Sequence, residues 1–141
     1  MNILKLLILC CIMAIFSCTQ SDTWITDMDD AYKISIESEK PLFMKFVGSD
    51  WCKFCMLSES YLFSDKEFQK LAKKELVLFV ADKTKDPKIR TENIDKYMKM
   101  YGIKGFPTFI ILNSQGKELS RKSGFDVKFD YMKWIKSTIK E

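Results

Sequence analysis

Residues 48–55 read Gly-Ser-Asp-Trp-Cys-Lys-Phe-Cys, and this stretch decides how the rest of the chain is interpreted. Two residues separate Cys52 from Cys55, which places both sulfurs on one side of a helical first turn, close enough to form a bridge. The run 42–47 before the pair is apolar apart from one Lys and is typical of a buried strand, whereas residues 52–61 favour a helix. Because free backbone N–H groups and the helix dipole stabilise a thiolate, the stretch predicts a reactive dithiol where a strand gives way to a helix.

This placement predicts thiol–disulfide exchange. The Cys52 thiolate would attack a disulfide, Cys55 would resolve the mixed disulfide, and Lys53 would add positive charge that favours the thiolate. No cofactor or metal is needed for this exchange. A zinc site and a purely structural disulfide are the alternatives. The first needs two further ligands, and the second would close too short a loop to constrain the unfolded chain much.

Composition narrows the possible chemistry further. The chain has 141 residues, five Cys and no His, which excludes Ser–His–Asp and Cys–His catalytic sites and any His-ligated metal. The net charge is +4, and the lysines alternate with acids, as at 66–67 and 73–75. Nucleic-acid-binding proteins usually gather their basic residues on one face. We therefore expect no nucleic-acid partner, and cysteine is the obvious reactive group.

The N-terminal residues have the features of an export signal. Lys5 is the one charged residue before an apolar run at 6–16, and this run is too short to span a bilayer. A basic start, a short apolar core and a small residue such as Ser17 are typical of a secretory signal peptide.

Residues 15–18, Ile-Phe-Ser-Cys, resemble a bacterial lipobox, in which the Cys is lipidated and begins the mature protein. Phe16 departs from that pattern, so a signal peptide cleaved nearby without lipidation is the alternative. We expect a lipoprotein-type signal peptide at 1–17, a tether at 18–23 and one folded domain at 24–141. The domain would be exported and anchored through Cys18 to a bacterial membrane, either in a periplasm or at the cell surface. Cys10 and Cys11 would leave with the signal, so Cys52 and Cys55 would lack partners for a zinc site.

Hydrophobic periodicity and the turn-forming residues between apolar runs predict the elements of the domain. Apolar runs predict strands at 42–47, 76–81 and 108–112, and a turn at 113–116 predicts a hairpin with a strand at 117–124. Helices are expected from residue 24 to Pro41, at 52–61, after 64, at 94–101 before Gly102, and at the C-terminal end. Thr26, a Ser64-to-Glu67 capping box and Asp126 are the expected N-caps.

Strands alternating with helices predict a parallel sheet covered on both faces, to which the hairpin adds antiparallel strands. The expected fold class is therefore α/β, with three layers and a central mixed sheet flanked by helices.

Two motifs then resemble the thioredoxin superfamily over roughly residues 41–140. They are the Trp51-Cys52-x-x-Cys55 segment and residues 101–108, Tyr-Gly-Ile-Lys-Gly-Phe-Pro-Thr. Residues 48–52 are similar to exported bacterial thioredoxin-like proteins such as the soluble C-terminal domain of DsbD. The resemblance implies a thioredoxin fold in which Pro107 is cis and faces the cysteine pair. Phe106, Pro107 and Trp51 would then contact substrate, whereas Trp24 and Trp134 are better explained by core packing.

The sequence also departs from the superfamily. Thioredoxins carry a buried acid in the strand before the motif, and here that position falls on Lys45 or Phe46, with Asp82 as a substitute for proton transfer. The dipeptide between the cysteines, residues 53–54, is Lys-Phe, which leaves the direction of electron flow open.

The expected function is a thiol–disulfide oxidoreductase acting on disulfides of exported proteins, with reduction favoured over oxidation. A membrane protein would supply the electrons. A non-catalytic peptide-binding or chaperone module on the same scaffold is the alternative from another class. A peroxidase would require an arginine near Cys52, and Arg90 and Arg121 are the arginines to examine.

Overall fold

The computed structural model describes residues 24–140. The expected signal peptide at 1–17, the lipid-attachment residue Cys18 and the tether at 18–23 lie outside the described residues.

A four-stranded mixed sheet forms the centre of the domain. Its strands are β1 (Leu42–Val47), β2 (Val77–Asp82), β3 (Thr108–Leu112) and β4 (Glu118–Ser123), in the order β2-β1-β3-β4. The pair β1–β2 is parallel, whereas β1–β3 and β3–β4 are antiparallel. The predicted strands and hairpin are confirmed.

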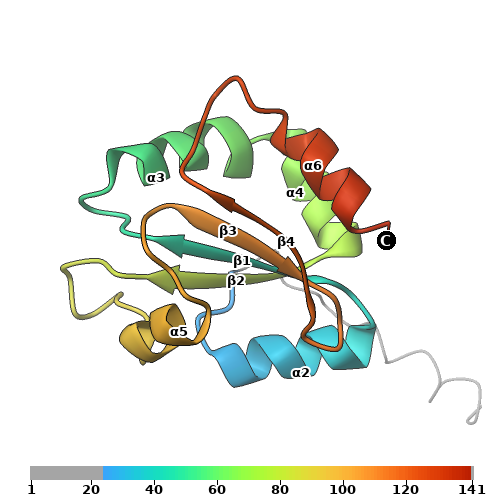
Figure 1. The fold of residues 1–141 in the computed structure, drawn as a ribbon, viewed down its shortest axis with the longest axis horizontal. Helices are drawn as coiled ribbons and strands as arrows, with labels where there is room; N and C mark the ends of the chain where they lie inside the picture. Colours follow the sequence, from blue (N-terminus) through green and yellow to red (C-terminus); the bar gives the residue numbers. More distant parts are fainter. Residues whose placement is uncertain (1–23, 141) are drawn as a thin grey trace, which may run out of the picture.

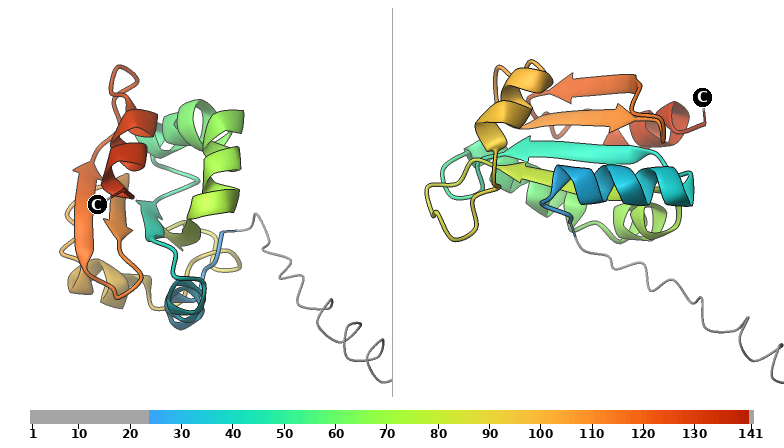
Figure 2. Two further views of the ribbon diagram at one scale, coloured as in Figure 1. Left: turned by 90° about the vertical axis from the view of Figure 1, so that its right-hand side faces the viewer. Right: turned by 90° about the horizontal axis from the view of Figure 1, so that it is seen from below.

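Helices cover both faces of this sheet (Figures 1 and 2). On one face lie α2 (Met28–Ser38) and α5 (Ile94–Met100). On the other lie α3 (Lys53–Ser58), the π-helical turn η1 (Glu59–Phe63), α4 (Lys66–Glu75) and α6 (Tyr131–Thr138). The structure therefore confirms the predicted three-layer α/β fold.

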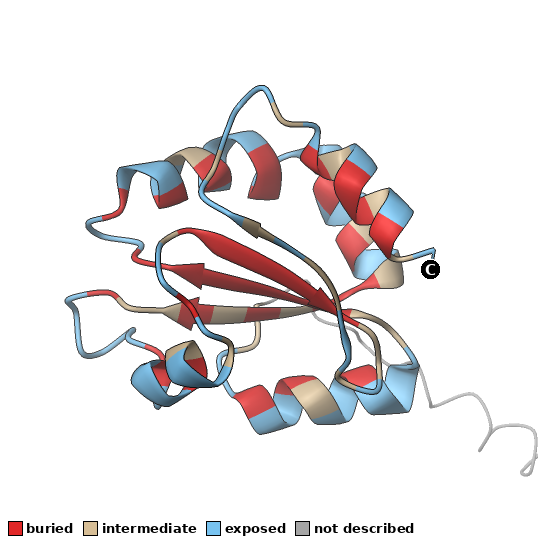
Figure 3. Ribbon diagram, in the orientation of Figure 1, coloured by how far each residue is buried: buried red, intermediate tan, exposed pale blue. Residues whose placement is uncertain are grey.

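The two central strands carry the core, and Figure 3 shows them buried along their length. Side chains of a strand alternate between faces. Leu42, Met44 and Phe46 accordingly pack toward α2 and α5. Phe43 and Phe109 point the opposite way, into an aromatic cluster beneath α4 and α6. β4 is partly exposed, as expected of an edge strand.

The helices α2, α4 and α6 begin later than the sequence predicts. In each, the N-cap is the residue whose side chain accepts a hydrogen bond from an N–H group of the first turn. Residue 25 bridges Phe79 in β2, so α2 starts later than expected, with Asp27 rather than Thr26 as its cap. Ser64 ends η1, and Asp65 caps α4 by accepting from the N–H groups of Glu67 and Phe68.

The last helix also begins later than predicted. Asp126 accepts a hydrogen bond from the N–H of Lys128 at 2.9 Å, which closes a turn instead of a helix. Asp130 is the actual cap and accepts from the N–H of Lys133 at 2.9 Å.

Within residues 24–140, none of the helices has both the length and the apolar character needed to cross a bilayer.

Candidate active site

The two cysteines lie at the start of α3 and form a disulfide. Their Cα atoms are 5.2 Å apart. Cys52 is the N-cap residue of α3, and its sulfur accepts a hydrogen bond from the N–H of Cys55 at 3.2 Å. This N–H is therefore already aimed at the sulfur that would carry charge as a thiolate.

Apolar side chains surround the pair on the sheet side. Val47 at the end of β1 forms a cluster with the two cysteines, and Val80 on β2 and Phe106 pack against this cluster. Cys52 is 7% exposed and Cys55 is 4% exposed. These neighbours shield both cysteines from most of the solvent.

The loop before β3 carries Phe106 to the site. The peptide bond between Phe106 and Pro107 is cis, and the Pro107 carbonyl accepts from the N–H of Gly124 at 2.7 Å. The Thr108 hydroxyl donates to the Gly105 carbonyl at 2.8 Å. The first bond ties the loop that precedes β3 to the end of β4, and the second closes the loop itself. Phe106 on this loop packs against the cysteine cluster.

Trp51 joins the cysteine motif to both neighbouring loops. Its indole N–H donates to the Lys83 carbonyl at 2.8 Å, and its ring meets Phe106 edge-on with centroids 5.4 Å apart. Trp51 is 42% exposed, whereas Trp134 is buried and Trp24 packs into the aromatic cluster. The expectation that Trp24 and Trp134 serve the core is confirmed.

Two carboxylates hold the loop that follows β2 beside the motif. Asp50 accepts from the N–H of Lys85 at 3.0 Å, and Asp82 accepts from the N–H of Ser49 at 3.0 Å. The Asp82 carboxylate, which the sequence suggested for proton transfer, thus binds the backbone of the active-site loop.

The two positions that could match the buried acid of thioredoxins lie on opposite faces of the sheet. Phe46 packs toward α2 and α5, whereas Lys45 points to the face that carries α3 and η1. The Lys45 ammonium contacts the Glu59 carboxylate at 2.9 Å and lies over the Trp24 ring. Burial lowers the pKa of Lys45, and the negative charges of Glu59 and Asp82 oppose this effect.

Sequence reasoning missed several exposed apolar side chains near the motif. Phe54 is 55% exposed, Met56 45% and Tyr61 64%, all on the helical segment that starts at the cysteines. Single residues of this kind carry no signal in the sequence, because only the fold shows which face of α3 and η1 is left uncovered.

The arginines that a peroxidase would require are bound elsewhere. Arg121 pairs with Glu118 on β4 and also donates to the Tyr101 carbonyl. Arg90 pairs with Asp95 in α5 at 3.3 Å.

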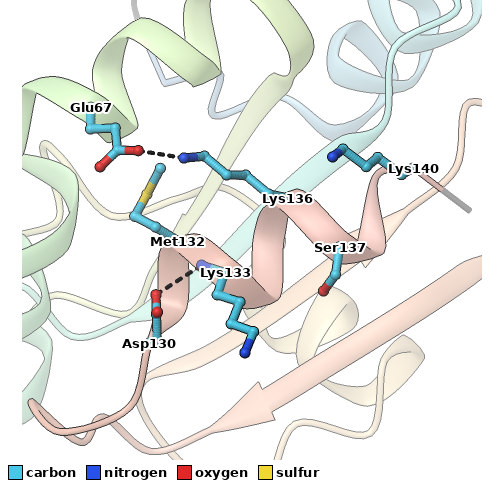
Figure 4. A pocket seen from close by; sticks show the side chains of 7 residues that line it. All are labelled: Glu67, Asp130, Met132, Lys133, Lys136, Ser137 and Lys140. Atoms are coloured by element: carbon cyan, nitrogen blue, oxygen red, sulfur yellow. Dashed lines mark hydrogen bonds and ion pairs between the residues drawn. The ribbon is translucent and has the colours of Figure 1, made fainter.

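A hollow lies between α4 and α6, near the C-terminal end (Figure 4). Lysines and two acids line it: Lys133, Lys136, Lys140, Glu67 and Asp130. Lys136 is paired with Glu67. The cysteines are not among its lining residues, so it is separate from the dithiol site. Over residues 24–140, no cluster of three or more His, Cys, Asp or Glu side chains is arranged to hold a metal ion.

Fold and site together define a thioredoxin-fold protein with a dithiol–disulfide pair at the start of a helix. The chain belongs to the family described as "Thioredoxin-like domain", which matches residues 28–138.

Two relatives have names that refer to thiol–disulfide chemistry. The chain is 28% identical over 116 residues to the disulfide bond reductase DsbH of Chlamydia pneumoniae, covering 79% of this chain and 69% of that protein. It is 34% identical over 90 residues to the thiol:disulfide interchange protein DsbD of Actinobacillus pleuropneumoniae. That match covers 62% of this chain and 14% of DsbD, so it concerns only a small part of that protein.

Solved structures show the same fold. A structure titled DsbH oxidoreductase superposes with a TM-score of 0.70 at 25% identity, covering 84% of each chain. The poplar thioredoxin h PtTrxh4 has a TM-score of 0.63 at 18% identity, covering 84% of this chain and 96% of its own, which shows the shared fold.

Proposed function

We propose that this protein is a thiol–disulfide oxidoreductase that reduces disulfides of exported proteins through Cys52 and Cys55. The observation that carries the proposal is the Cys52–Cys55 disulfide at the N-terminus of α3, against the loop of Phe106 and Pro107. The similarity to a protein named disulfide bond reductase favours the reducing direction.

The reaction follows from the two sulfurs. In the dithiol form the Cys52 thiolate attacks one sulfur of a substrate disulfide, and the other substrate sulfur leaves and takes up a proton. Cys55 then loses its proton and attacks the Cys52 sulfur, which releases the second substrate sulfur as a thiolate. Two electrons pass to the substrate, and the Cys52–Cys55 disulfide is restored.

The surroundings suit a peptide substrate. The backbone of the Phe106–Pro107 loop would pair with an extended segment next to the reacting disulfide, and Trp51 would contact it. Together with Trp51 and Phe106, the exposed side chains of Phe54 and Met56 make up an apolar rim.

The test is turnover of a disulfide-containing peptide with dithiothreitol as the electron source. Cys52→Ser should abolish turnover, and Cys55→Ser, once dithiothreitol has been removed, should trap a mixed disulfide through Cys52. Unchanged turnover in Cys52→Ser would refute the proposal.

Reductase and oxidase differ in the reduction potential of the pair, which glutathione or dithiothreitol buffers measure. The reduction potential of thioredoxin is about −270 mV, and that of the oxidant DsbA is about −120 mV. A value close to the first supports the reductase, and a value close to the second supports the oxidase.

The exposed apolar rim also fits a peptide-binding module without redox function. That alternative predicts that a Cys52→Ser, Cys55→Ser double variant still binds unfolded peptide and performs the cellular function. The oxidoreductase predicts that peptide binding is retained in part while the cellular function is lost.

We place the protein outside the cytoplasm, anchored through Cys18, with a membrane protein as its electron donor. Support for this comes from the export-type N-terminal residues and from the similarity to a segment of DsbD. Labelled palmitate should be incorporated into the wild type and not into Cys18→Ser, which should move to the soluble fraction. Equal fractionation of the two proteins would contradict anchoring.

A further inference from the structure

Lys45 is the only charged side chain that is buried among residues 24–140, with 6% of the residue exposed. A buried charge is costly unless it has partners, so its retention calls for an explanation. The ammonium has three contacts: the Glu59 carboxylate at 2.9 Å, the Trp24 ring at 3.9 Å and the Phe63 ring at 4.5 Å. These contacts explain how the charge is tolerated but assign it no role.

Two paths connect Lys45 to the resolving cysteine. Along the sheet, Val47 lies two residues further on the same face, and Val47 belongs to the apolar cluster that contains Cys55. Along the helix, the Glu59 N–H donates to the Cys55 carbonyl, so the two residues are one turn apart and their side chains are neighbours. The carboxylate that pairs with the ammonium therefore belongs to a residue one helical turn from Cys55.

Burial decides which charge of the pair acts on the sulfur. The Glu59 side chain is 56% exposed, whereas that of Lys45 is 7% exposed. Water and salt screen an exposed charge far more than a buried one. The other facing carboxylate, Asp82, is engaged by the N–H of Ser49. Of these three charges, that of Lys45 is therefore the one least screened by water.

We propose that Lys45 is a positioning residue for the resolving step, and that its fixed positive charge stabilises the Cys55 thiolate. In the mixed disulfide, Cys55 gives its proton to solvent and attacks the Cys52 sulfur. The bond between Cys52 and the substrate breaks, and the substrate sulfur leaves as a thiolate that takes up a proton. Lys45 neither gives nor takes a proton in this step.

The first test measures the ionisation of Cys55 directly. In a Cys52→Ser full chain, the rate of iodoacetamide labelling at Cys55 is followed against pH by peptide mass spectrometry, so the other cysteines need no change. Lys45→Met should slow labelling at pH 7 about tenfold, which corresponds to about one unit in the thiol pKa, whereas the exposed-site control Lys66→Met should leave it unchanged. Rates within twofold of the parent would overturn the proposal.

Glu59→Gln separates an electrostatic role from a structural one. Glu59 is half-exposed, so this variant should fold, and loss of the opposing charge should leave labelling at pH 7 as fast as in the parent or faster. If Glu59→Gln and Lys45→Met slowed labelling equally, the pair would be a structural link and the proposal would fail. This variant also provides the test if Met at position 45 prevents folding.

The second test uses the complete dithiol and rests on the proposed function. With a disulfide peptide as substrate, Lys45→Met should accumulate the mixed disulfide at Cys52, which the parent resolves quickly. If neither protein reacts with the peptide, the proposed function fails, while the labelling of Cys55 still tests the role of Lys45. Reaction without accumulation in Lys45→Met would overturn that role.

Discussion

At the scale of single residues, the site depends on close approach as much as on reactive groups. Gly48 has no side chain, and a Cβ atom there would overlap the indole of Trp51. The indole needs this space to reach the Lys83 carbonyl and the Phe106 ring. The glycine therefore fixes the position of the residue that flanks the reactive cysteine.

Gly48→Ala should accordingly displace Trp51. We expect a loss of stability of about 1–3 kcal/mol, as for other overpacked sites, together with slower reduction of peptide disulfides. Tryptophan fluorescence and urea unfolding measure the two effects. Gly105→Ala is the matched control, since a Cβ there meets no atom within 4 Å. Equal effects of the two substitutions would contradict the packing argument.

At the scale of elements, two phenols join helices that cover the same face of the sheet. The hydroxyl of Tyr32 in α2 is hydrogen-bonded to that of Tyr101, the residue that ends α5. Burial and this hydrogen bond raise the pKa of Tyr101 above its ordinary value. The phenol pair thus adds stability while both groups remain protonated.

Tyr101→Phe should lower the free energy of unfolding at pH 7 by about 0.5–1.5 kcal/mol, the typical net value of one hydrogen bond. Because the folded-state pKa is raised, the contribution is complete below the unfolded pKa of about 10 and is lost as pH rises toward the folded value. Urea unfolding at pH 7 and above pH 10 should therefore show the difference between wild type and variant shrinking with pH. A difference that grows would contradict this assignment.

The start of α4 gives a second prediction at this scale. Asp65→Ala should lower the free energy of unfolding by about 0.5–2 kcal/mol, because its carboxylate accepts from the N–H groups of Glu67 and Phe68. Ser64→Ala, one residue earlier, should cost less, since Ser64 closes η1 instead of capping α4. Chemical denaturation of both variants checks the order of the two effects.

These elements also show what the sequence could predict. The central strands were recognised because both faces are buried, which leaves apolar runs such as 42–47, interrupted only by Lys45. The helix starts were misplaced because several neighbouring residues can serve as caps, and only the three-dimensional path of the chain selects one. The π-helical turn η1 has no sequence pattern that separates it from an α-helix.

The features of the site also fall into those that the sequence could predict and those that only the fold reveals. The pairing of Cys52 with Cys55 and the cis bond at Pro107 could be predicted because these residues belong to short motifs with fixed spacing. The Lys83 carbonyl was missed because a backbone group carries no residue signature. The Lys45–Glu59 pair joins β1 to η1 and follows no helical or strand period, so only the fold reveals it.

At the scale of the whole molecule, stability and redox direction are linked. Folding, unfolding, oxidation and reduction form one thermodynamic cycle. A folded pair that is more reducing than the same pair in the unfolded chain must therefore make the oxidised protein the more stable form. For this two-electron couple, about 30 mV corresponds to about 1.4 kcal/mol. The strong oxidant DsbA lies at the other extreme, because its reduced form is stabilised.

The proposed reductase should therefore unfold at a higher temperature without dithiothreitol than with it. The Cys52→Ser, Cys55→Ser double variant has no bridge in either condition, so its unfolding temperature should not respond to the reductant. Lys45→Met should widen the gap between the two forms, because it removes a charge that favours the thiolate of the reduced protein. If the reduced wild type unfolds at the higher temperature, the folded pair is oxidising and the direction of the reaction is the reverse of the one proposed. Because the unfolding temperature requires no substrate, it determines this direction before the physiological partner is identified.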